Sequence, residues 1–141
     1  MSGALLGLDL GEKRIGVAVV PAGTSIALPV KTLEAKGREK NLAEFQRLIA
    51  EHRVEKVVVG LPVTLKGTLG IAAEKRTQEV VWYQGRLNVP VEMWDERLSS
   101  KEVERMLIDA DVRREKRKEV IDQLAAQRIL QNYLDFKKAN A

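Results

Sequence analysis

The chain has 141 residues, of which 45% are hydrophobic and 31% are charged, a composition that is ordinary for a globular protein. This length suits one compact domain with one core and leaves no room for a second domain of ordinary size. The longest apolar stretches, at 5–10, 15–20 and 57–61, are far shorter than the roughly 20 residues of a membrane-spanning helix. We therefore expect a single domain, 1–141, that does not cross a membrane.

The chain contains no cysteine and a single histidine, His52. These counts exclude disulfides, a thiolate nucleophile, Cys-based zinc sites and any metal site that needs two histidines. A metal site in this chain would therefore have to use carboxylates. Met1 is followed almost directly by an expected strand instead of a signal-peptide pattern, so we expect a cytoplasmic protein. We expect His52 to lie at the surface after a helix, with no catalytic part.

The net charge of +4 comes from 24 basic and 20 acidic residues, and it is unevenly distributed. One short segment, which we call the basic cluster, has a net charge of +4, equal to that of the whole chain. It contains five cations offset only by Glu115, namely Arg113, Arg114, Lys116, Arg117 and Lys118. Such clusters bind nucleic acid by neutralising phosphates. A solvated loop can have the same composition, and charge alone does not separate these two interpretations.

Three strands are expected first. Residues 5–10 and 15–20 are apolar and flank a short turn at 11–14, which predicts an antiparallel hairpin. Residues 27–33 predict a third strand, and Pro29 favours an edge position for it because proline lacks a backbone donor.

Helices and strands then alternate. Helical spacing of apolar residues predicts a helix over 38–52, and 56–60 is typical of a buried parallel strand. A loop at 61–70, a helix at 71–87 and a strand at 89–94 follow. Ser99 and Glu102 have capping-box spacing for a helix through residue 107, after which the basic cluster leads into a last helix at 119–136. This order predicts an α/β fold whose mixed sheet has three antiparallel strands followed by parallel strands, with helices on both faces.

Asp9 interrupts an apolar strand that should lie at the centre of the sheet. A buried carboxylate without a partner costs several kcal/mol, so Asp9 needs a cation, hydrogen-bond donors or solvent at the end of its strand. The alternative is an aspartate that caps the turn at Gly11.

Two more acidic positions lie at the ends of expected elements. Asp95 and Glu96 follow the strand 89–94 directly, at the edge where open α/β sheets bind ligands, and only one of them can face inward. Asp122 shares a helix face with small and apolar residues, namely Ala125, Ala126, Ile129 and Tyr133. The alternatives are a solvated loop for the acidic pair and a helix-dipole interaction for Asp122.

Taken together, Asp9, Glu96 and Asp122 suit two-metal hydrolysis of a phosphodiester, with two divalent ions roughly 4 Å apart. Oxygen ligands favour Mg²⁺ or Mn²⁺. The hypothesis is that Asp9 bridges both ions and that Glu96 and Asp122 each complete one side.

Lys13 and Arg14, in the hairpin turn, are candidates for contacts with substrate phosphates, and a glycine such as Gly16 would let a backbone approach closely. An ordinary exposed turn is the alternative. Trp82 and Tyr83 could stack on bases, although their helical spacing favours a core position for at least one of them.

Four motifs carry a resemblance to a known family. The segment LGLDLGEKRIGVA at 6–18 closely resembles the opening of the YqgF (RuvX) family of Holliday junction resolvases or pre-16S rRNA nucleases. VVGLP at 58–62, followed by Gly67 and Thr68, resembles that family's central strand and loop. WDERLSS at 94–100 resembles its acidic motif, and IDQLAA at 121–126 with ILQNYL at 129–134 resembles its last helix. The match covers nearly the whole chain.

The resemblance implies an RNase H-like fold, and it matches Asp9, Glu96 and Asp122 to the family's catalytic acids, with Glu96 favoured over Asp95. It implies a metal-dependent endonuclease using Mg²⁺ or Mn²⁺, with pre-16S rRNA or branched DNA as substrate. Residues predicted to contact nucleic acid are Lys13, Arg14, Arg97 and the basic cluster. A resolvase that cuts two strands symmetrically would need a homodimer. Substrate preference is open where the chain departs from the family pattern, at Glu12, Lys66 and Leu69.

Two other functions remain open. A non-catalytic RNA-binding or ribosome-assembly module could keep the fold and use the basic cluster for phosphate contacts. An actin-like or sugar-kinase ATPase has a phosphate loop that resembles residues 9–16, but such enzymes need two domains to enclose a nucleotide, and this chain has length for one.

Overall fold

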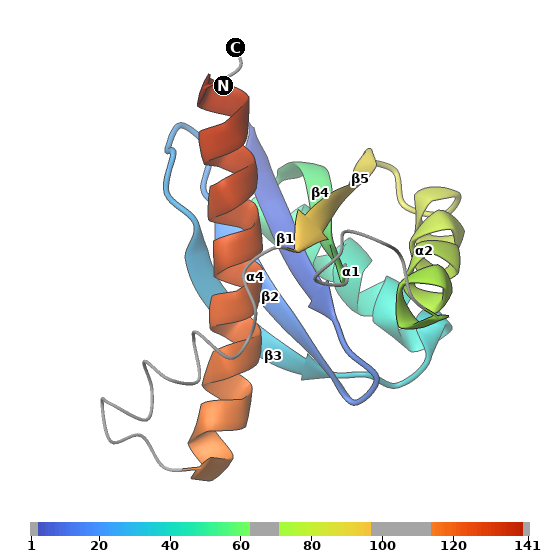
Figure 1. Ribbon diagram of the computed structural model, residues 1–141. Helices are drawn as coiled ribbons and strands as arrows, with labels where there is room; N and C mark the ends of the chain where they lie inside the picture. The colour runs from blue at the N-terminus through green and yellow to red at the C-terminus, as the bar shows by residue number, and fades with distance from the viewer. Residues whose placement is uncertain (1–2, 63–70, 97–113, 140–141) are drawn as a thin grey trace.

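The computed structural model of the protein describes residues 3–62, 71–96 and 114–139. Its elements are β1 (Ala4–Leu10), β2 (Arg14–Val20), β3 (Leu28–Glu34), α1 (Arg38–His52), β4 (Val54–Pro62), α2 (Ile71–Gln84), β5 (Val91–Glu96) and α4 (Arg114–Ala139). The expected order of strands and helices is confirmed within these ranges (Figure 1). The helix expected at 99–107 lies outside the described residues.

The strands form one five-stranded sheet in the order β3-β2-β1-β4-β5. β1 pairs antiparallel with β2 and parallel with β4, and β4 pairs parallel with β5. The mixed sheet is therefore confirmed, and β1, which carries Asp9, is its central strand. Pro29 lies in the edge strand β3 as predicted, beside a shift in the register with β2.

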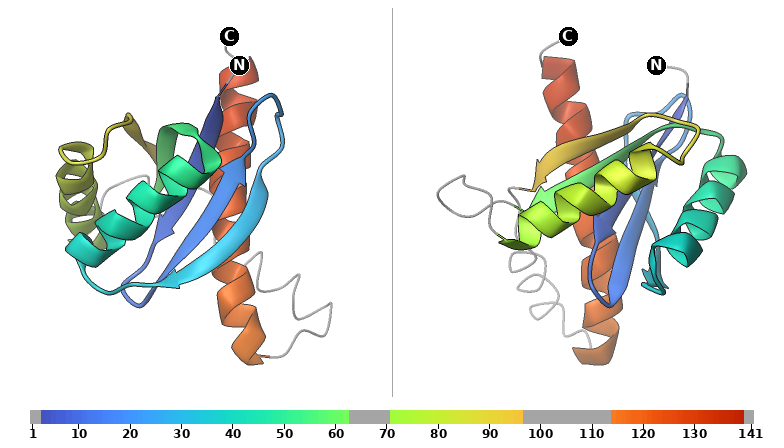
Figure 2. Two further views of the ribbon diagram at one scale, coloured as in Figure 1. Left: turned by 180° about the vertical axis from the view of Figure 1, so that it is seen from behind. Right: turned by 90° about the vertical axis from the view of Figure 1, so that its right-hand side faces the viewer.

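The two faces of the sheet bury two separate cores, because alternate residues of a strand point to opposite faces. Leu6, Leu8 and Leu10 of β1 pack in the core under α1 and α2. Leu5 packs in the other core, against Leu130 and its neighbours on α4. Figure 2 shows α1 and α2 on one side of the sheet and the long α4 on the other. Gly7 and Asp9 have the same parity as Leu5 and so belong to the α4 face.

Glycines on this face allow α4 to cross the β1–β2 hairpin at close range. A Cβ atom on Gly7 would lie 3.0 Å from the Cβ of Leu130, and one on Gly16 would lie 1.8 Å from the backbone oxygen of Asp122. Gly16 is also the cross-strand partner of Asp9. The crossing point therefore brings the backbone at Asp122 next to the strand pair that carries Asp9.

Two differences between the predicted boundaries and the structure bear on the candidate site. The last helix begins at Arg114, not at residue 119, so the described part of the basic cluster forms its first turns instead of a loop. Arginine, lysine and glutamate are good helix formers, and this propensity outweighs the unfavourable position of cations at a helix N-terminus. β5 ends at Glu96, so Asp95 and Glu96 lie within the strand and do not follow it.

Asp122 accordingly lies beyond the first two turns of α4, which argues against a simple helix-dipole role for its carboxylate. None of the described helices is both long enough and apolar enough to cross a membrane.

Gly16→Ala should destabilise the protein by at least about 2 kcal/mol, because α4 would have to move away from the sheet to accept the new methyl group. Urea unfolding measures the loss. Gly85→Ala is a suitable control, because its Cβ would approach Trp82 no closer than 3.8 Å and should change stability little. Equal stability of the Gly16 and Gly85 variants would contradict the close crossing.

Candidate active site

The structure brings together two of the three predicted acids, Asp9 of β1 and Asp122 of α4. The pKa of Asp9 is raised from its ordinary 3.8 to about 6, mainly by burial and then by the negative charge of Asp122, while the positive charge of Arg76 opposes the shift. A carboxylate that is both desolvated and beside a second carboxylate is costly to ionise. Such a pair is a strong candidate for a cation site.

Arg14, the first residue of β2, forms an ion pair with Asp122, with its Nε 2.7 Å from Oδ2. The Arg14 side chain is 37% exposed and that of Asp122 is 19% exposed. The pair fixes the orientation of the Asp122 carboxylate beside Asp9. Contact of Arg14 with nucleic acid stays a prediction, but the structure gives this arginine a carboxylate partner that the sequence did not indicate.

Arg76 of α2 is a second arginine near the acids, and the sequence analysis missed it. Its side chain is only 15% exposed, and its Nη1 lies 2.8 Å from Oε1 of Glu79. Its charge lowers the pKa of Asp9, although less than burial and Asp122 raise it. No sequence signal identified Arg76, because its approach to Asp9 depends on how α2 packs beside the sheet.

Glu96 is the last residue of β5, and its backbone pairs with Pro62 of β4. The side chains of Asp95 and Glu96 lie outside what the structure describes. Within the described residues, no group of three or more acidic or histidine side chains is arranged to hold a metal ion. The structure places Asp9 near Asp122, and the part played by Glu96 stays a prediction.

Trp82 and Tyr83 have structural partners. Tyr83 is 2% exposed, its ring meets that of Phe45 edge to face at 5.1 Å, and its hydroxyl accepts a hydrogen bond from Asn41. The prediction that at least one of the two is core is confirmed. The Trp82 ring packs against two guanidinium groups, those of Arg38 at 4.8 Å and Arg86 at 4.1 Å. Base stacking by Trp82 would have to compete with these arginines.

Most of the other residues predicted to contact nucleic acid lie in the described part of the chain, and two do not. Lys13 is exposed in the β1–β2 turn, which the backbone closes through the N–H of Gly11 donating to the oxygen of Arg14 at 2.9 Å. Arg114, Lys116, Arg117 and Lys118 lie on the first turns of α4. Arg97 and Arg113 lie outside the described residues, so these two predicted contacts stay predictions. Lys66 and Leu69, where the chain departs from the family pattern, also lie outside the described residues. His52 is the last residue of α1 and is half-buried, whereas a surface position after the helix was expected.

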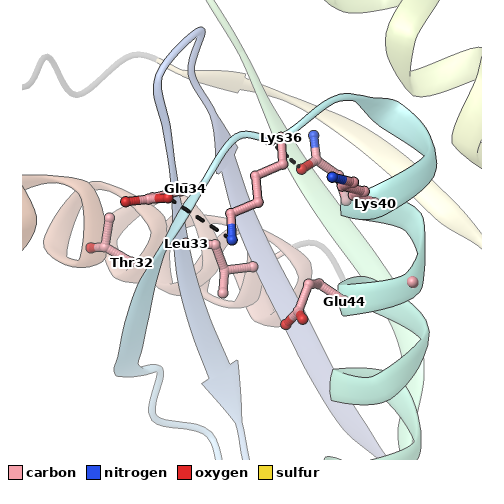
Figure 3. A pocket seen from close by; sticks show the side chains of 8 residues that line it. Thr32, Leu33, Glu34, Lys36, Lys40 and Glu44 are labelled. Atoms are coloured by element: carbon pink, nitrogen blue, oxygen red, sulfur yellow. Dashed lines mark hydrogen bonds and ion pairs between the residues drawn. The ribbon is translucent and has the colours of Figure 1, made fainter.

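A hollow of about 450 Å³ lies between β3 and the start of α1 (Figure 3). Lys36 spans it, with its Nζ 4.0 Å from Glu34 and its backbone N–H donating to Oδ1 of Asn41 at 3.1 Å. Asn41 also donates to Tyr83, so this amide anchors the β3–α1 connection to the core. Neither Asp9 nor Asp122 lines the hollow. Its polar groups have a structural role, and the acid pair remains the candidate active site.

Asp9→Asn should stabilise the metal-free protein at high pH. Because folding raises the pKa of Asp9 to about 6, the fold favours the protonated form of this carboxyl group. The resulting contribution to folding stability is complete below about pH 3.8 and is lost as the pH rises through 6. The neutral amide avoids this loss, so the free energy of unfolding should be about 3 kcal/mol higher than in the wild type at pH 8 and nearly equal at pH 4. Urea unfolding in chelator at both pH values is the measurement. A pH-independent difference would contradict the raised pKa.

Sequence comparison identifies the family. The family model described as "RuvX: Holliday junction resolvase" matches residues 3–136. A protein of Clostridioides difficile strain 630, named "Putative pre-16S rRNA nuclease", is 47% identical over 137 residues, covering 97% of each chain. A protein of Syntrophomonas wolfei with the same name is 47% identical over 93% of each chain.

Structural comparison identifies the fold. The RuvC of T. thermophilus in complex with a Holliday junction substrate has a TM-score of 0.59 at 16% identity, covering 99% of this chain and 98% of that chain. The fowlpox virus resolvase in complex with Holliday junction DNA has a TM-score of 0.59 at 10% identity, covering 94% and 97%. At these identities the likeness concerns the fold alone, and it confirms the RNase H-like architecture. With its family match spanning 3–136, the chain belongs to the RuvX family.

Proposed function

We propose that the protein is a divalent-metal-dependent nuclease that hydrolyses phosphodiester bonds in structured nucleic acid, with Asp9, Glu96 and Asp122 as its catalytic acids. The observation that carries this proposal is the half-buried pair of Asp9 and Asp122, which come from opposite ends of the chain. Membership of the RuvX family supports the same chemistry.

The acid pair fits Mg²⁺ or Mn²⁺. Two carboxylates are held close enough for one to raise the pKa of the other, and a divalent cation relieves that repulsion while accepting oxygen ligands. When bound, such ions would activate water and stabilise the leaving oxygen. Asp9 and Asp122 would hold them from two sides of the point where α4 crosses β1.

Glu96 is proposed as the third ligand because of its register. It lies two residues after Trp94, whose ring meets Tyr133 of α4 edge to face at 5.3 Å. Glu96 therefore shares the pleat parity of a residue on the α4 face, and Asp95 has the opposite parity. This reasoning supports the choice of Glu96 that the family resemblance implies.

Cations around the acid pair suit a polyanionic substrate. Lys13 is exposed on the turn beside Asp9, and the helical part of the basic cluster begins α4 on the same element as Asp122. Arg14 would keep Asp122 oriented until a substrate phosphate arrives and would then share its charge with that phosphate.

We infer that precursor 16S rRNA is the first substrate to test and branched DNA the second. The relatives that match nearly the whole chain carry the rRNA name, whereas the family description and two structural neighbours refer to Holliday junctions. A nuclease acting on either substrate would work in the cytoplasm. A homodimer would be needed for symmetric cleavage of a junction.

Asp9→Asn and Asp122→Asn should each lower metal-dependent cleavage by at least about 100-fold, because each removes one charged ligand of the proposed ions. Cleavage of a labelled precursor 16S rRNA fragment and of a four-way DNA junction is measured with Mg²⁺ and with Mn²⁺. Titration of Mn²⁺ by electron paramagnetic resonance gives a separate readout, in which both variants should bind the ion more weakly.

The matched control is Asp135→Asn, because Asp135 is an exposed aspartate on the same helix that accepts a hydrogen bond from Gln131 at 3.1 Å. It should cleave and bind Mn²⁺ like the wild type. If the pure wild-type protein binds both nucleic acids but cleaves neither, the proposed activity is wrong and the protein is a binding module.

A further inference from the structure

A second hollow, of about 390 Å³, lies at the C-terminal end of β1, on the opposite side of the strand end from Asp122. It is formed by the β1–β2 turn, the start of α1 and the first half of α2. Three cations line it, Arg38, Lys75 and Arg76, together with two acids, Glu12 and Glu79. We call it the α1–α2 hollow.

The α1–α2 hollow has a net positive charge, because its three cations exceed its two acids by one. Arg76 already neutralises Glu79 through the 2.8 Å ion pair, so Glu12 is the remaining acid beside Arg38 and Lys75 among the described residues that line the hollow. The Arg38 guanidinium is held in place against the Trp82 ring at 4.8 Å. The hollow therefore has an excess of positive charge on side chains from two helices.

Arg76 also has a donor that no acceptor in the described residues uses. Its Nε is buried and donates a hydrogen bond to nothing in the described part of the chain. Leaving a buried donor of a charged group without an acceptor is unfavourable, so an anion bound beside this Nε would stabilise it. A guanidinium with a free Nε is suited to an anion with several oxygen atoms.

The start of α1 adds backbone donors to the same hollow. Gly37, its N-cap, has a φ of 97°, a conformation that favours glycine, and no side chain caps the described helix there. The first helical hydrogen bond runs from the N–H of Asn41 to the oxygen of Gly37 at 2.9 Å, so the N–H groups before Asn41 have no acceptor within the helix. A helix N-terminus of this kind attracts phosphate.

We propose that the α1–α2 hollow binds a backbone phosphate of the nucleic-acid strand next to the phosphate that the acid pair acts on. Gly11 lines the hollow and follows Asp9 by two residues, which is at most about 7 Å along an extended chain. A strand passing the end of β1 would then contact the acids on one face and Arg38, Lys75 and Arg76 on the other. This inference rests on the proposed nuclease function and identifies a binding site for its substrate.

The test compares Arg38→Gln and Lys75→Gln with Lys40→Gln. Lys40 is an exposed lysine on the first turn of α1 that lines the neighbouring hollow but not this one. Binding of a labelled precursor 16S rRNA fragment and a four-way DNA junction is measured by fluorescence anisotropy in chelator, over a range of salt concentrations. The double variant Arg38→Gln/Lys75→Gln should bind about tenfold more weakly, with a salt slope smaller by about 1, whereas Lys40→Gln should match the wild type.

A direct readout is the nuclear magnetic resonance signal of the Arg76 Nε–H group, which should shift when a short oligonucleotide is added to the wild-type protein. Unchanged binding by the double variant, or an equal loss in Lys40→Gln, would overturn the inference even if the wild type cleaves. A wild type that binds without cleaving would refute the nuclease and still decide this inference through the variants. A wild type that binds no nucleic acid would refute both.

Discussion

The close crossing of α4 over the β1–β2 hairpin is the constraint on which the candidate site depends. It is possible only because Gly16 presents no side chain to the backbone at Asp122, where a Cβ would lie 1.8 Å away. Gly7, two residues before Asp9 on β1, allows a similar close approach to Leu130 of α4. Leu5 and the apolar face of α4 then bury the contact in a separate core. The carboxylates of a central strand and of the last helix become neighbours as a result of this packing, and not through any local sequence motif.

This packing places two carboxylates near each other, and the neighbouring arginines compensate their negative charge only in part. The pKa of Asp9 is raised by burial and by Asp122, while Arg14 pairs with Asp122 and Arg76 acts on Asp9 from the other side. Two acids are thus set between two arginines. Buried charges that stay incompletely compensated are typical of functional sites, because a bound ion or substrate can complete them. Under our proposals a divalent ion satisfies the acids and a substrate phosphate satisfies Arg76.

The sequence predicted the parts of this arrangement that depend on periodicity. Alternation in β1 indicated a central strand interrupted by Asp9, and the helical spacing from Asp122 to Tyr133 indicated the buried face of α4; both are confirmed. Contacts between elements could not be predicted from the sequence, so the position of Arg76 near Asp9 was missed. Gly16 was expected to let a substrate backbone approach closely, but it is the backbone of α4 that approaches it. The start of α4 was placed too late, because the basic cluster was taken for a connecting segment although its residues favour helix.

The central claim is that Asp9 and Asp122 form one cation-binding unit, and the titration of Asp9 tests it most directly. Nuclear magnetic resonance of the ¹³C-labelled carboxyl group would follow this titration in chelator and again with saturating Mg²⁺. The account predicts a pKa of about 6 in chelator, lowered when Mg²⁺ is present because the ion favours the carboxylate. An ordinary pKa near 3.8 in chelator, or a raised value that Mg²⁺ leaves unchanged, would contradict the account.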